Sequence, residues 1–60
     1  MRDWLVTLVS EDGAHQREVF IDSIPSCLTS KTVAGMRAER QCNEEGRRTW
    51  KVVDAKELEP

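Results

Sequence analysis

The chain has 60 residues, of which 38% are hydrophobic and 33% charged, and its formal net charge is −2. This composition is typical of a globular domain and excludes an intrinsically disordered chain, and the length allows one domain at most. No apolar run approaches the roughly 18–20 residues of a membrane-spanning helix, and the N-terminus lacks the features of a signal peptide, so we expect a cytoplasmic protein.

The first predicted elements are two strands joined by a tight turn. The segments WLVTLV and REVFID are rich in β-branched and aromatic residues, which favours strands over about 3–9 and 17–22. The Asp12-Gly13 dipeptide between them is typical of a two-residue hairpin turn in which both central residues have positive φ. A hairpin with this turn has the following directly opposed pairs: Trp4 with Ile21, Leu5 with Phe20, Val6 with Val19, and Val9 with Gln16.

A helix is predicted over about 30–44, after a connection that contains Pro25. The hydroxyl of either Ser26 or Ser30 is suited to accept a hydrogen bond from an early amide of this helix. The apolar periodicity of the segment is weak, and Gly35 within it costs about 1 kcal/mol relative to alanine. We therefore expect a helix that is stable only when it packs against a sheet.

A third strand is predicted after the helix. Gly46 stands where a left-handed residue commonly ends a helix, and the segment TWKVV favours a strand over about 49–55. Residues 57–60 are expected to be a frayed end. The order strand, strand, helix, strand predicts a single α+β domain over 1–60, a three-stranded antiparallel sheet with one helix packed on one face.

This layout resembles the short strand–strand–helix–strand proteins of unknown function that are common in bacteriophage and prophage genomes. The opening WLVTLV, the turn EDG and the helix stop that leads into WKVV carry the resemblance. It implies an accessory or host-interaction role, and it implies no functional residues.

The residues that usually perform catalysis or bind metals are few and scattered. His15 is the only histidine, and an enzyme would need it beside Cys27 or Cys42 in a pocket that excludes water. These three residues are one ligand short of a structural zinc site, and no glycine-rich phosphate loop is present. We therefore predict no enzyme, no metal and no cofactor, and we expect both thiols to be reduced.

A locally basic segment lies within this acidic chain. Residues 1–30 sum to a charge of −3, residues 31–51 to +3 and the remaining tail to −2. With Trp50 to stack a base, the segment is the alternative hypothesis of a nucleic-acid-binding module. Interrupting acids and the net negative charge favour instead a solvated surface with Trp50 in the core. The residues of the alternative site are Arg37, Arg40, Arg47, Arg48 and Lys51.

Both faces of the predicted first strand are largely apolar. A half-exposed antiparallel strand normally alternates apolar with polar residues, and one helix can cover only one face of a three-stranded sheet. The other face would expose Leu5, Val9, Phe20 and one of the adjacent valines, Val52 or Val53, unless the connection shields them. We predict that Leu5, Val9 and Phe20 form a partner-binding surface, because a contiguous apolar patch marks association.

A chain of this length buries only about 60% of the surface that its unfolded form exposes, so an additional stabilising element is expected. We therefore predict a noncatalytic protein–protein interaction module that self-associates. The symmetric homodimer would either stack its sheets or join its edge strands. A different protein at the same face is the other possible partner, and no membrane partner is expected.

Overall fold

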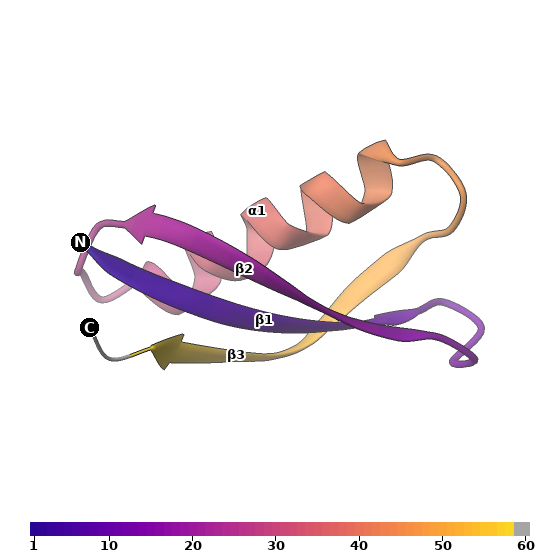
Figure 1. Cartoon of the computed structure of the whole chain (residues 1–60), viewed down its shortest axis with the longest axis horizontal. Coiled ribbons are helices and arrows are strands. Elements are labelled where there is room, and N and C mark those ends of the chain that lie inside the picture. The colour runs from indigo at the N-terminus through magenta and orange to yellow at the C-terminus, as the bar shows by residue number, and fades with distance from the viewer. Residues whose placement is uncertain (59–60) are drawn as a thin grey trace.

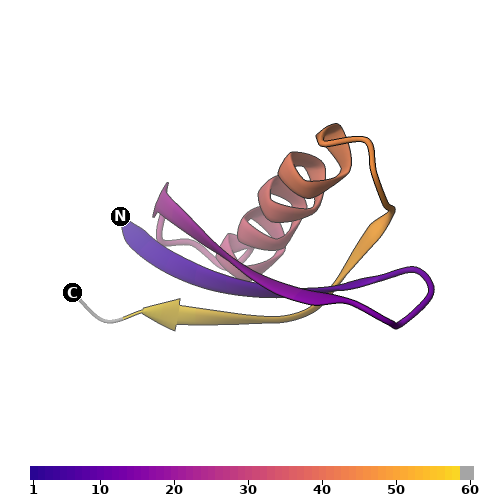
Figure 2. The same cartoon turned by 45° about the vertical axis from the view of Figure 1, so that its right-hand side comes forward.

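The computed structural model describes residues 1–58, which form three strands and one helix (Figure 1). The elements are β1 (Arg2–Ser10), β2 (Gln16–Ile24), α1 (Ser30–Glu44) and β3 (Trp50–Leu58). The strands form one antiparallel sheet in the order β2-β1-β3, and α1 lies on one face of it (Figure 2). The predicted α+β class and the single helix on one face are confirmed. Within residues 1–58, no helix is both long and apolar enough to cross a membrane.

The helix connects the two edge strands across the central one. Because β2 and β3 both run antiparallel to β1, they are parallel to each other, and α1 returns the chain along the sheet between them. The start of β1, the end of β3 and the β2–α1 connection lie at one end of the sheet, whereas the β1–β2 turn and the α1–β3 connection lie at the other (Figure 1). The two ends therefore hold different sets of polar side chains.

The core fills the space between α1 and the sheet. Every second residue of β1 points to it, and α1 meets the sheet with small side chains, which allow the helix axis to approach closely. Gly35 faces Val52, and a Cβ added at Gly35 would lie in ordinary van der Waals contact with the Val52 side chain. The buried core residues are Trp4, Val6, Leu8, Val19, Ile21, Ile24, Ala34, Ala38, Cys42, Trp50 and Ala55.

The register of the β1–β2 hairpin agrees with the prediction, but its turn does not. All four predicted pairs are present. The loop spans 11–14 and is closed by a hydrogen bond from the Ser10 N–H to the His15 carbonyl at 2.9 Å. Within this loop only Gly13 has positive φ, at 75°. The Asp12 carboxylate accepts hydrogen bonds from the Ser10 hydroxyl and the Ala14 N–H, and these stabilise a turn other than the predicted one with two positive φ angles. Both loops leave the strands in the same register.

The helix occupies its predicted range, with a different N-terminal arrangement. Neither predicted serine caps it: Thr29 is the N-cap residue and makes no side-chain cap hydrogen bond. Ser30 instead stabilises the connection, since its hydroxyl accepts from the Cys27 N–H at 2.8 Å and lies 2.6 Å from the Pro25 carbonyl oxygen. At the other end Gly46 has φ 76° and ends the helix as predicted.

The third strand is longer than predicted. It continues to Leu58, which pairs with Asp3, and Glu57 pairs with Trp4 and lies 3.4 Å from the Arg2 guanidinium. The prediction of a frayed end is therefore wrong for residues 57 and 58, and residues 59 and 60 lie outside the described residues. The physical reason is that β1 begins at Arg2 and offers these residues a strand to pair with.

The close contact of α1 with β3 gives a stability prediction. We expect Gly35→Ala to raise the free energy of unfolding by about 0.5–1 kcal/mol, because alanine favours the helix and the new carbon would lie 3.5 Å from Val52 Cγ1. Gly46→Ala is the matched control and should lower it by about 1–2 kcal/mol, because φ is 76° there. Urea unfolding measures both, and a destabilised Gly35→Ala would contradict the packing described.

Candidate interaction surface

The sheet face opposite α1 is built from alternate residues of all three strands. On β1 these are the residues between the buried ones, and their partners on β2 and β3 point the same way. No other element within residues 1–58 lies on this side (Figure 2). We call it the open face; its rows across the sheet are Phe20-Leu5-Lys56, Glu18-Thr7-Asp54 and Gln16-Val9-Lys51.

The three predicted contact residues all lie on the open face. Phe20 is 56% exposed, and Leu5 and Val9 are half-buried, as expected for a central strand flanked by side chains of its neighbours. Leu5 and Phe20 are directly opposed, whereas the polar row through Thr7 separates them from Val9. The structure therefore brings Leu5 and Phe20 into contact range and leaves Val9 at a distance along the strand.

One residue of this face was missed by the sequence analysis. Leu58 pairs with Asp3, two positions before Leu5 on β1, so it lies on the open face beside Leu5 and is half-buried there. The prediction of a frayed end over 57–60 excluded Leu58 from the sheet. No local signal would have found this residue, because Ala55 and Leu58, the apolar residues of this segment, are three positions apart and do not follow the period of two that marks a strand.

A β-bulge places the adjacent valines of β3. The β1–β3 register shifts between Thr7 and Leu8, which leaves Val53 as the extra residue of the bulge. Val52 packs toward Gly35 of the helix, and Val53, 59% exposed, lines a groove between α1 and β3 together with Met36. We therefore assign neither valine to the open face.

The five cations of the alternative nucleic-acid site lie in three different places. Lys51 is on the open face opposite Val9, whereas Arg37 and Arg40 lie on α1 around the exposed Met36. Arg47 and Arg48 belong to the α1–β3 connection. The sequence segment is basic, but the fold does not gather its charges into one surface.

Trp50 is part of the core, and its ring makes a cation–π contact with an arginine. It is 7% exposed, and the guanidinium of Arg17 lies 5.5 Å from the centroid of its ring. Arg17 also donates to Glu45 at 2.9 Å, which lowers the pKa of the Glu45 carboxyl. Asn43 accepts from the Trp50 N–H at 2.7 Å, so the start of β3 is tied to the end of α1. Trp50 is not available to stack a base.

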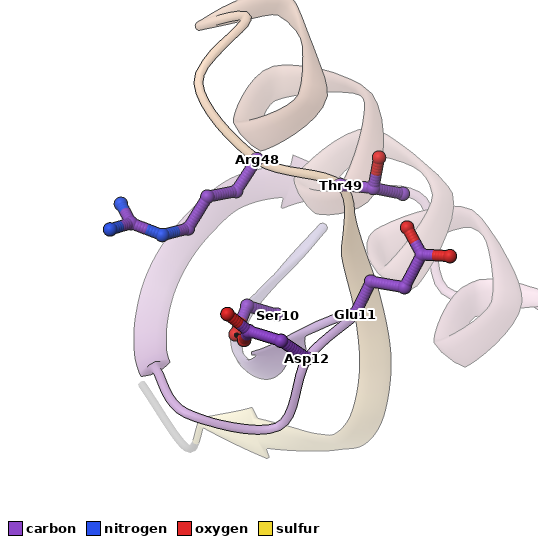
Figure 3. A pocket seen from close by; sticks show the side chains of 5 residues that line it. All are labelled: Ser10, Glu11, Asp12, Arg48 and Thr49. Carbon is purple, nitrogen blue, oxygen red and sulfur yellow. Dashed lines mark hydrogen bonds between the residues drawn. The ribbon is translucent and has the colours of Figure 1, made fainter.

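The loops at the hairpin end form a shallow polar hollow (Figure 3). The Glu11 N–H donates to the Thr49 carbonyl at 2.9 Å and joins the two loops. Hydrogen bonds from the Ser10 hydroxyl and the Ala14 N–H lower the pKa of Asp12, so this carboxyl stays ionised and serves the turn. In Figure 3 the Arg48 side chain points away from Glu11. The hollow is the junction of the β1–β2 turn and the α1–β3 connection.

The histidine and the cysteines lie apart from one another. His15 is in the hairpin turn, Cys27 is exposed in the β2–α1 connection, and Cys42 is buried on the core side of α1. The hairpin turn and the β2–α1 connection lie at opposite ends of the sheet (Figure 1). In the described part of the chain no three His, Cys, Asp or Glu side chains are grouped as metal ligands. No protein-family model, curated protein or solved structure matches this chain.

The two thiols should differ in reactivity. The Thr29 hydroxyl, then the Thr29 N–H and the Ser30 hydroxyl, lower the pKa of Cys27, whereas burial raises the pKa of Cys42. We expect iodoacetamide to modify Cys27 rapidly in the folded protein and Cys42 only after unfolding, as mass spectrometry would record. Cys27→Ala should abolish the rapid reaction. Equal rates for both thiols under native conditions would contradict the burial of Cys42.

Proposed function

We propose that this chain is a noncatalytic protein–protein interaction module that self-associates through the open face of its sheet. One observation carries the proposal: the single helix occupies one face, and the other retains Phe20 at 56% exposure directly beside Leu5. Leu58 extends this apolar surface on the neighbouring row. A monomer gains little from such an apolar cluster in water, whereas a partner that covers it gains burial energy.

The small size of the core supports an association that adds stability. The helix contributes mainly Ala34, Gly35, Ala38 and Cys42 to the core, and small side chains bury little apolar area. Complete burial of a phenylalanine side chain is worth about 1.5–3 kcal/mol, which is a large share of the stability of a domain this short. Covering Phe20 in both copies would therefore stabilise the fold as well as the dimer.

The charges of the open face favour a second copy as the occupant. On this face β2 carries Glu18, whereas β3 carries Lys51 and Lys56 with Asp54 between them. A two-fold axis parallel to the strands would lay β3 of one copy over β2 of the other. Because Lys56 and Phe20 share a row, the aliphatic stem of Lys56 would then cover the partner's Phe20. The β2 and β3 sides, of opposite net charge, would face each other.

The accessory or host-interaction role implied by the resemblance to short bacteriophage proteins belongs to the same proposal, with a host protein as the alternative occupant of the open face. A cytoplasmic location is also proposed, since neither cysteine is in a disulfide. The nucleic-acid alternative has less support, because its cations lie in separate places and Trp50 is buried.

Substitution of Phe20 tests the proposal. We expect the wild-type chain to show a mass above that of one chain in light scattering at high micromolar concentration. Phe20→Glu should weaken the open-face contact at least about tenfold, because it removes two buried rings and adds two charges.

Leu28→Glu is the matched control, since Leu28 is fully exposed in the β2–α1 connection, and it should leave the mass unchanged. A wild-type protein that is monomeric, or a Phe20→Glu protein of unchanged mass, would show that the open face is not a self-association surface.

A further inference from the structure

The outer edge of β3 is a second surface that the open face does not explain. In the order β2-β1-β3, β3 pairs with β1 only, so its outward N–H and C=O groups have no strand partner within residues 1–58. Such an edge is a template for a further strand. After the bulge at Val53, residues 54 to 58 pair with β1 without a further shift in register. The irregularity between Arg2 and Trp4 belongs to the pairing of β1 with β2. This part of the β3 edge is regular in register and is therefore suited to accept a strand.

Exposed apolar side chains lie beside this edge, on the helix side of the sheet. Met36 is 66% and Val53 59% exposed, and both line the groove between α1 and β3, whose lining also includes Ala55. These are two of the five large hydrophobic residues that are exposed among the described residues. Their position next to unpaired backbone groups fits the docking of a strand better than it fits open solvent.

We infer that the β3 edge pairs antiparallel with the β3 edge of a second copy, about a two-fold axis at Ala55. The sequence around this residue is self-complementary in charge: Asp54 would lie opposite the partner's Lys56, and Lys56 opposite the partner's Asp54. Both side chains point to the open-face side, since they pair with Thr7 and Leu5. The small side chain of Ala55 lies at the axis, where bulk would hinder two identical residues.

Neighbouring registers are unfavourable by the same criterion. An axis at Asp54 would oppose two aspartates, and an axis at Lys56 would oppose two lysines. On the β2 edge an axis at Val19 would oppose Glu18 to the apolar Phe20, and the bulge near Ser23, whose φ is 60°, distorts that edge. Only the β3 edge offers reciprocal opposite charges on a regular segment.

The joined sheet would also cover the exposed apolar groove. With the axis perpendicular to the sheet, both helices lie on the same side, and the two grooves face each other across Ala55. Met36 and Val53 of each copy would then be shielded by the other copy. The axis of this contact is perpendicular to the sheet and lies outside β3, whereas the axis of the open-face contact runs parallel to the strands over β1. The two contacts are therefore separate ways of pairing two copies.

The experiment uses the Phe20→Glu chain, in which the open-face contact is removed two strands away from the β3 edge. We expect this chain to be a dimer in light scattering. Asp54→Lys and Lys56→Asp, each added singly, should raise the dissociation constant at least about tenfold, because each opposes like charges twice. Mixing the two single variants in equal amounts should restore a dimer, and so should the double variant Asp54→Lys/Lys56→Asp. Circular dichroism confirms that each variant is folded.

The outcomes separate this inference from the proposed function. A folded Phe20→Glu chain that is monomeric overturns the pairing of two β3 edges. The pairing is overturned in the same way if the edge instead binds a strand of another protein. Failure of the mixture and of the double variant to restore the dimer overturns the register at Ala55. A dimer of equal mass in the wild-type and Phe20→Glu chains, with the expected charge behaviour, supports the edge contact and counts against the open face. Phe20→Ser replaces Phe20→Glu if the latter does not fold.

Discussion

The docking of one helix on one side of a three-stranded sheet is the constraint on which this structure depends. The helix approaches closely because it presents Ala34, Gly35 and Ala38, and this closeness encloses Val6 and Leu8 of the central strand completely. Within residues 1–58 no second element covers the other face of the sheet, so the apolar residues there remain accessible. Stability of the core and availability of the surface thus have the same origin, the scarcity of elements in a short chain.

The tie between the end of the helix and the start of β3 fixes which surfaces become available. Arg17 stacks on Trp50 and pairs with Glu45, and Asn43 accepts from the Trp50 amide. These contacts draw Trp50 into the core and set the direction of β3. The bulge that follows absorbs one residue, and beyond it the strand presents a regular edge with alternating charges. The open face and the β3 edge lie on different sides of the same strand, which lets one small domain offer two separate contacts.

Much of the fold could be predicted from local patterns, and the exceptions have specific causes. The hairpin register followed from strand composition and the Asp-Gly signal, and it tolerated the wrong turn because both loops close the same pairs. The helix ended at Gly46 as expected, since a left-handed position favours glycine. The strand character of Glu57 and Leu58 was missed because it arises from pairing with Trp4 and Asp3, more than fifty residues earlier in the sequence. Of the candidate site, Leu5 and Phe20 were predictable as a cross-strand pair, whereas Leu58 and the edge beside Val53 were not.

The sequence by itself determined the number and order of the elements, the face of β1 that would be enclosed, and the presence of excess apolar side chains on its other face. These properties depend on side-chain periodicity and turn residues, which are local. Only the tertiary structure decided that β1 lies in the centre, that Val53 leaves the regular register, and that the basic residues separate onto three surfaces. Those outcomes depend on contacts between distant segments, whose geometry no single stretch of the chain encodes.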